Sequence, residues 1–168
     1  HLTRSGFGLT NCQSMMSALM RVAAWIKDIK PQATSGGSFT SGAWRTRTLN
    51  TIENDINSII LELNANQFRM KRGVFHCFAT CPAHSVNRHQ ARLYNVTQAA
   101  IAILGTPEYT PTTQTHSIID GQFTVTDEND FYEIQHVCSV TAISQGFGVE
   151  GNFTTEIYTQ ARFSVIGF

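Results

Sequence analysis

The stretch "SIILELNANQFRMKRGVFHCFATCPA", residues 58–83, decides the fold class of this chain. Its apolar and β-branched residues fall in short runs, and "NAN" and "KRG" separate these runs with residues that favour tight turns. The pattern therefore predicts three successive strands joined by two turns.

The residues that follow repeat this pattern. "ARLYNVT" and "AAIAILGT", residues 91–97 and 99–106, are typical of a hairpin, and residues 117–141 form a second hairpin around the turn sequence "DEND". "GFGVEGNF" is a glycine-rich loop, and residues 155–168 are a final strand.

The residues before the stretch also alternate with period two. "WIKDIK", residues 25–30, predicts a strand that ends at Pro31, because proline cannot donate to a strand ladder. A Gly/Ser/Thr-rich loop follows, and then "AWRTRTLNT" alternates again. The total is about eight to ten short strands at the roughly 8–12-residue spacing of sandwiches and barrels. The expected fold class is an all-β sandwich.

Residues 9–24 have the different, helical spacing of apolar residues. Asn11 is a suitable N-cap for this helix. The stripe is narrow and rich in Met, which fits a neck helix in an oligomer or a helix lying on the domain body. We therefore divide the chain into an N-terminal helical or neck segment, 1–24, and a β domain, 25–168. The apolar positions of the stripe are Leu9, Cys12, Met16, Leu19 and Ala23.

Composition narrows the function classes. The 168 residues carry twelve basic and twelve acidic side chains and no formal net charge, so the basic surplus of a nucleic-acid binder is missing. No apolar run approaches the roughly 18 residues of a membrane span. The sequence starts with His1 rather than Met, from which we expect a processed or partial chain.

The cysteines are expected to be buried free thiols. Cys77 and Cys81 share one predicted strand, where four residues span about 13 Å, and a disulfide needs Cα atoms within about 7 Å. A zinc site that also uses Cys138 is the alternative, but no CxxC pair supports it.

The motifs of common enzymes are missing, so we expect no catalytic residue, cofactor or metal. The sequence contains no HExxH, GxSxG or phosphate loop. His84, Arg88 and His89 cluster in "PAHSVNRHQ" without a nearby carboxylate, which fits a polar loop better than a metal site or an acid–base pair. The acidic cluster of "DENDFYE" is explained by a turn, although calcium or paired glycosidase carboxylates are the alternatives.

The "WRTR" stretch allows two interpretations. Arg45 and Arg47 lie on one face of a predicted strand, about 6.6 Å apart, where they could grip a carboxylate or a sulfated sugar. Alternatively they are structural, with Trp44 beside them, and pair with Glu108 or Glu133 across a subunit interface. We favour the structural or interface role, since contacts with receptors lie more often in apical loops.

Six blocks, in order, resemble one family. Together they are similar to the C-terminal domain of many bacteriophage tail-fibre and virion-appendage proteins. The resemblance covers about residues 25–168. The blocks are "IKDIKPQATSGGSFTSGAWRTRTLNT", "FRMKRGVFHCFATCPAHSVNRHQARLYNVT", "ILGTPEY", "FYEIQHVC", "GFGVEGNF" and "EIYTQARFSVI".

The resemblance implies a jelly-roll β-sandwich akin to complement globular-head and tumour-necrosis-factor domains, assembled as a homotrimer at a fibre tip. It implies a non-enzymatic viral protein in the virion that binds a host cell-surface glycan or receptor and joins other fibre or virion proteins. An extracellular location outside a virus is the alternative, since related domains occur in secreted cellular proteins. The alternative function is a structural module that forms or decorates an extracellular filament or capsid.

The expected ligand contacts lie in three loops, residues 82–90, 105–117 and 144–152. Aromatic side chains there are suited to stacking on sugar rings, and the polar ones to hydrogen bonding. The candidate ligand-binding residues are His84, Arg88, His89, Tyr109, Gln114 and Phe147. "NVT" at 95–97 and "NFT" at 152–154 are glycosylation sequons, which matter only in a secretory pathway.

Overall fold

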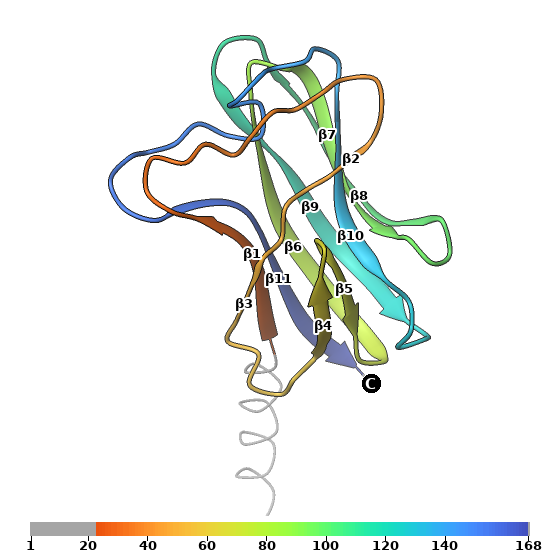
Figure 1. The fold of residues 1–168 in the computed structure, drawn as a ribbon. Helices are drawn as coiled ribbons and strands as arrows, with labels where there is room; N and C mark the ends of the chain where they lie inside the picture. The colour runs from red at the N-terminus through yellow and green to blue at the C-terminus, as the bar shows by residue number, and fades with distance from the viewer. Residues whose placement is uncertain (1–22, 168) are drawn as a thin grey trace, which may run out of the picture.

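Two antiparallel sheets face each other in the computed structural model, which describes residues 23–167 (Figure 1). The predicted helix therefore lies outside the described residues, except for its last two positions. Those two positions are strand, because β1 begins at Ala23. The first sheet contains, in order, β3 (Thr51–Glu53), β1 (Ala23–Lys30), β11 (Glu156–Gly167), β6 (Gly73–His84) and β9 (Gln114–Val125).

The second sheet has six strands. They are, in order, β4 (Ile60–Asn64), β5 (Gln67–Met70), β10 (Tyr132–Cys138), β7 (Asn87–Asn95) and β8 (Ala100–Thr110), with β2 (Arg45–Thr46) paired to β10. The chain passes between the sheets at most connections, so most neighbouring strands are far apart in sequence, with the β4–β5 and β7–β8 hairpins as the exceptions. The order confirms the jelly-roll sandwich, with eleven strands among the described residues.

The opening stretch folds as its pattern predicts. β4 and β5 are joined by the two-residue turn Ala65–Asn66, in which both residues have positive φ, as a type I′ hairpin turn requires. β6 follows as a twelve-residue strand in which Phe75, Cys77 and Cys81 are fully buried. The cysteines confirm the prediction of free, buried thiols on one strand face.

The space between the sheets holds the main core. Alternate residues of each strand point inward and pack there, with Phe68, Phe163 and Tyr132 forming an aromatic group at its centre. A smaller cluster around Phe39 and Val86 fills the end of the sandwich that carries the β6–β7 and β8–β9 turns. We call this end the turn end; it is the top of Figure 1.

The glycine-rich loop between β10 and β11 covers the turn end. Gly148 has φ of +139°, and a Cβ there would lie 2.4 Å from the Tyr158 ring, so only glycine fits. The Tyr158 hydroxyl donates to the Thr34 carbonyl at 2.7 Å and ties the 31–44 loop to the same place. Among residues 23–167, no helix is long and apolar enough to cross a membrane.

Candidate functional site

The three predicted contact loops are mostly strand. Residues 82–84 and 87–90 belong to β6 and β7, and most of 105–117 belongs to β8 and β9, so only their turns and the 144–152 segment are loop. The loop assignment was too wide because polar residues at strand ends resemble loop composition. The turns nevertheless meet: the Ser85 amide donates to the Thr113 carbonyl at 3.2 Å, and the His84 amide to the Gly146 carbonyl at 3.0 Å.

A groove of about 630 Å³ opens beside these turns, on the second sheet. β7, β8 and β10 contribute to it, and we call it the β7–β8–β10 groove. Its volume falls within the range of small-molecule sites, about 300–1,000 Å³. The lining residues are Arg88, His89, Gln90, Pro107, Glu108, Tyr109, Val137, Cys138 and Ser139.

Strand register explains which side chains face outward in the groove. Arg88 pairs with Tyr109 and lies beside Ser139, while Gln90 pairs with Pro107. Residues paired across strands point to the same face, and this face is turned away from the core. Tyr109 is 59% exposed and Arg88 is exposed, so two of the candidate ligand residues stand together on an open surface.

His89, which also lines the groove, faces the core side of β7 and is buried. Its side chain is 3% exposed, and its Nδ1 lies 2.9 Å from His136 Nε2 while its Nε2 lies 2.8 Å from Thr115 Oγ1. The alternation of the strand places it on the core side, between outward-facing Arg88 and Gln90. The imidazole ring is held by its hydrogen bonds inside the sandwich.

Burial controls the ionisation of this histidine pair. Desolvation, followed by the nearby Arg47 guanidinium, lowers the pKa of His89 to about 4. The same two causes lower the pKa of His136 well below its ordinary value. Both rings are therefore neutral at pH 7. His136 Nδ1 has no hydrogen-bond partner among the described residues, so this ring is held on one side only.

The remaining candidate ligand residues hold the loops. Gln114 Oε1 accepts from the Val149 amide at 2.7 Å, and the His84 ring lies 3.3 Å from Ser85 Oγ. The Phe147 ring stacks on Phe39 with centroids 4.3 Å apart. These contacts are made within the turn end, so the structure brings these three residues close to the groove without making them part of its lining.

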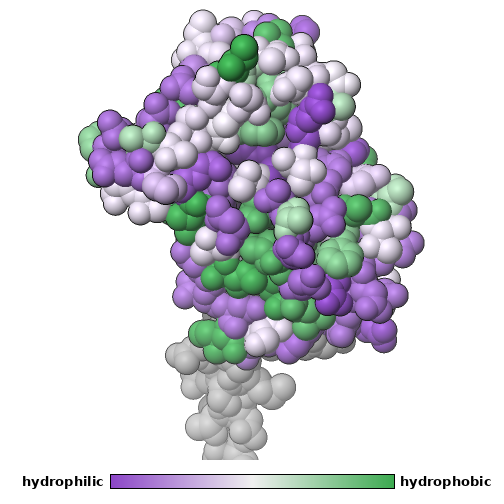
Figure 2. Space-filling view, viewed as in Figure 1, coloured by the Kyte–Doolittle hydropathy of each residue, from purple (hydrophilic) through white to green (hydrophobic). Residues whose placement is uncertain are grey.

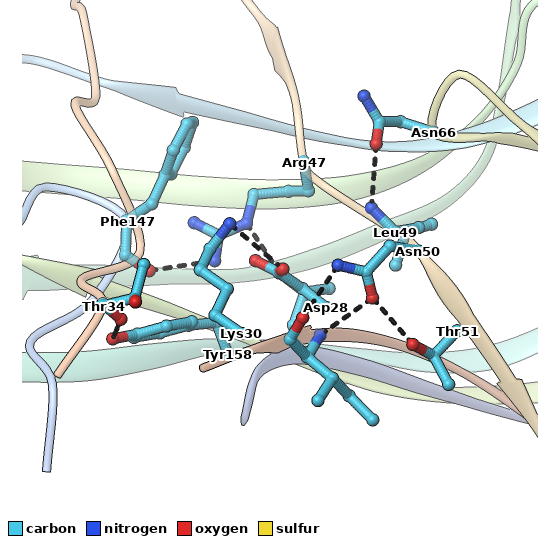
Figure 3. A network of polar contacts seen from close by, with 12 residues as sticks. Asp28, Lys30, Thr34, Arg47, Leu49, Asn50, Thr51, Asn66, Phe147 and Tyr158 are labelled. Carbon is cyan, nitrogen blue, oxygen red and sulfur yellow. Dashed lines mark hydrogen bonds and ion pairs between the residues drawn. The ribbon is translucent and has the colours of Figure 1, made fainter. Parts of the chain in front are cut away.

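Arg47 is buried at the centre of a polar network (Figure 3). Its Nε donates to Thr159 Oγ1 at 2.7 Å, its Nη1 to the Pro82 carbonyl at 2.9 Å, and its Nη2 to the Phe147 carbonyl at 3.0 Å. The guanidinium also lies 4.2 Å from the Phe147 ring centroid. Burial lowers the pKa of Arg47 to about 10, which leaves it charged at pH 7.

A second cation lies close by in the same network. Asp28 is 1% exposed and has Lys30 Nζ 3.3 Å from its Oδ1. Desolvation raises the pKa of Asp28, and the charges of Lys30 and Arg47 oppose that rise. The Arg47 side chain therefore joins the first sheet to the β10–β11 loop, its amide donates to the Ile134 carbonyl of the second sheet at 2.8 Å, and no partner subunit is needed to satisfy it.

Arg45 and Trp44 lie on the surface beside the network. Arg45 donates to the Thr40 and Ser41 carbonyls, at 3.0 and 3.2 Å, and so closes its own loop. The guanidinium of Arg92 lies 3.9 Å from the Trp44 ring centroid and 4.3 Å from that of Tyr94. Neither arginine of "WRTR" contacts Glu108 or Glu133 within the described part of the chain.

The acidic segment behaves as a turn. Asp130 is 3% exposed and accepts hydrogen bonds from Asn95 Nδ2 at 2.9 Å and Gln98 Nε2 at 3.1 Å. Asn95 of the first sequon is thereby buried. Within residues 23–167, no three His, Cys, Asp or Glu side chains come close enough to hold a metal ion.

Sequence reasoning missed two residues that organise the turn end. His136 continues the inward alternation of Tyr132, Ile134 and Cys138, so the period of "FYEIQHVC" was a signal that the ring is buried. Glu156 accepts from the amides of Gly151 and Asn152 at 2.9 and 2.8 Å, and from Ala33. The glycine-rich segment just before Glu156 was the available signal for the bonds to Gly151 and Asn152, whereas the bond to Ala33 comes from a distant loop.

Two solved structures share this fold. The globular domain of zebrafish complement 1qA protein matches with a TM-score of 0.52 and 13% identity, over 86% of this chain and 96% of that domain. Murine APRIL at pH 5.0 matches with a TM-score of 0.50 and 7% identity, over 85% and 98%. No protein-family model and no curated protein matches the chain. At these identities the likeness is one of fold alone: the chain has the jelly-roll sandwich of complement globular-head and tumour-necrosis-factor-like domains.

Proposed function

We propose that this chain is a non-enzymatic, homotrimeric tip or appendage domain of a phage virion. It binds a host cell-surface glycan or protein and attaches to other fibre or virion proteins. The six ordered sequence blocks support the viral part of this proposal, and the jelly-roll fold is compatible with it. Affinity comes from avidity, because three weak sites on one rigid head engage a surface together.

The proposal rests mainly on one observation: the groove and the ends of the β domain's chain lie at opposite ends of the sandwich. The β7–β8–β10 groove lies near the turn end, while β1 starts and β11 finishes at the other end of the sandwich (Figure 1). A segment attached ahead of Ala23 enters at that far end. When a shaft is attached at that far end, the groove lies at the exposed tip of the fibre.

Two separate apolar patches support assembly into a threefold ring. A ring needs two different surfaces on each subunit, since each contact is heterologous. Hydrophobic side chains gather over β3, β4 and β5 in Figure 2, where Ile52 and Leu61 are each 39% exposed. The second patch is smaller and lies on the outward face of the first sheet, where Phe78 is 38% and Ile166 is 45% exposed among polar neighbours such as Arg162 and Asp120. We propose that the first patch of one subunit packs on the second patch of the next.

Light scattering tests this assembly. The protein should have three times the 18.6 kDa mass of one chain and should keep it on dilution to micromolar concentration. Phe78→Glu or Leu61→Glu should yield monomers, because each places a charge in the contact. Leu104→Glu is the matched control: Leu104 is 53% exposed on β8, at the edge of the second sheet opposite to β4, and its replacement should leave the trimer intact. A monomeric parent protein contradicts the assembly.

Adsorption to cells tests the binding role. Labelled trimer should bind host cells and compete with whole virions for them, and the monomeric variants should bind much more weakly through loss of avidity. A trimer that polymerises into filaments and binds no cell would instead support the structural-module alternative. Hydrolysis of a surface polysaccharide by the pure protein would contradict the non-enzymatic assignment.

A further inference from the structure

We propose that the β7–β8–β10 groove binds an acidic saccharide, with Arg88 gripping the anionic group and Tyr109 stacking on the sugar ring. This inference rests on the proposed binding function and assigns it a site and a ligand class. The anionic group is a carboxylate or a sulfate ester, since both present two oxygens to a guanidinium fork.

The free guanidinium of Arg88 is the first observation. Within the described residues its side chain makes no hydrogen bond or ion pair, although its backbone amide donates to Ser139 Oγ at 3.0 Å. Arg45, Arg47 and Arg92 are, by contrast, occupied by carbonyl, hydroxyl or amide oxygens. The backbone of Arg88 is therefore held by its strand, and the N–H donors of its charged guanidinium remain available to a ligand.

The aromatic neighbour of Arg88 is the second observation. Tyr109 stands directly across the β7–β8 ladder from it and is 59% exposed. Side chains opposite each other across strands have Cβ atoms about 4.5–5.5 Å apart, so one sugar can touch both. Pro107 and Val137 continue the lining on the next step of the ladder and offer apolar surface to ring carbons.

Few other polar groups in the groove are free to hydrogen-bond to a ligand, so the guanidinium of Arg88 is the main group that can recognise one. Gln90 Nε2 is already committed to the Gly105 carbonyl at 2.8 Å, and Ser139 Oγ accepts from the Arg88 amide. A neutral sugar would find the aromatic face and few donors to its hydroxyl groups. An acidic sugar adds the charge-assisted bonds of Arg88, which are roughly twice as strong as neutral ones.

The nearby carboxylate of Glu108 does not pair with the guanidinium of Arg88. Glu108 also lines the groove, but it pairs in register with inward-facing His89, and strand alternation sends its side chain to the opposite face from Tyr109. No ion pair joins Arg88 and Glu108 within the described residues. Arg88 is therefore the charged side chain that the groove presents on its outward face, next to Tyr109.

Titration with four probes tests the proposal. The trimer is titrated with 3′-sialyllactose, a galacturonate tetramer, a sulfated disaccharide and lactose, followed by NMR shifts of groove amides. Single-site binding is expected near millimolar for at least one acidic probe and about tenfold weaker or absent for lactose. The sialic acid and uronate arms separate a carboxylate ligand from a sulfate ester.

Three variants locate the site. Arg88→Ala should weaken the acidic probe by about tenfold or more while leaving lactose unchanged, and Arg88→Lys should recover only part, because it lacks the fork. Tyr109→Ala should weaken every probe. Arg72→Ala, which removes an exposed arginine from the β5–β6 turn at the opposite end of the sandwich, is the control and should change nothing. All four variants, the control included, should remain trimeric.

The possible failures are distinguishable. Unchanged acidic binding by Arg88→Ala overturns the site, as does a parent that binds lactose as well as the acidic probes. A parent that adsorbs to cells but binds no acidic probe at about 10 mM overturns the ligand class and leaves the binding function standing. A parent that neither adsorbs to cells nor binds any probe overturns both.

Discussion

Replacing Arg47 with Ala should destabilise the domain more than any other change at the "WRTR" stretch. The side chain is 1% exposed and gives its three donors to Thr159, Pro82 and Phe147. Truncation strands the buried Pro82 carbonyl and the part-buried Phe147 carbonyl, each at a cost of up to about 1–3 kcal/mol, and leaves a cavity under the Phe147 ring. Relief from burying the charge offsets part of this loss. The expected decrease in the free energy of unfolding is about 3–5 kcal/mol.

Thermal and urea unfolding measure this loss. For a domain of this size, about 1 kcal/mol shifts the melting temperature by roughly 2–4 °C, so Arg47→Ala should melt about 6–20 °C below the parent. All samples are compared at one protein concentration, because subunit association adds to apparent stability. Arg47→Lys should also be less stable than the parent, since one ammonium cannot reach three fixed acceptors.

Arg45→Ala is the matched control. Arg45 also donates to two carbonyls, but these belong to the surface loop at Thr40 and Ser41, where water can replace it. Its removal should cost about 1 kcal/mol or less. An Arg47→Ala protein that unfolds within about 1 kcal/mol of the parent would refute the reasoning, and would show that the buried carbonyls recover partners by relaxation.

Three other predictions concern titration, thiols and loop anchoring. His89 and His136 have pKa values below the ordinary 6.5, so below that pH the unfolded chain binds more protons than the folded one. The free energy of unfolding is therefore complete above pH 6.5. Towards pH 4 it falls by about 1.4 kcal/mol per pH unit for each ring. Urea midpoints across this range should show the slope, and a His89→Gln, His136→Gln double variant should flatten it; an equal slope would contradict the assignment. Desolvation raises the pKa of both Cys77 and Cys81, the latter to about 12, so iodoacetamide should label them only after unfolding, as peptide mass spectrometry can show. Glu156→Ala should speed proteolysis within 144–155, because it frees three amides; unchanged cleavage rates would mean that other contacts hold the loop.

Local pattern was sufficient for most strands and turns, although "AWRTRTLNT", predicted as one strand, forms only the two-residue β2 and the first residue of β3. A period of two and the turn residues act between near neighbours in sequence, so "NAN" and "DEND" could be recognised as turns and β6 as a strand with Cys77 and Cys81 inside. Strand ends were harder to predict, because polar residues such as those of "PAHSVNRHQ" occur equally in loops and on the outer face of strands.

Only the tertiary structure decided the roles of individual polar residues. Arg45 and Arg47 share one predicted face, yet one closes a surface loop and the other is buried, because the β10–β11 loop folds over Arg47 alone. His89 and Arg88 are adjacent in sequence and were assigned one role, but the pairing of β7 with β8 and β10 turns one inward and the other outward. Sequence determined which segments become strands, since that choice is local. The partners of each strand come from distant parts of the chain, and they determined which side of each strand is buried and where a groove remains open.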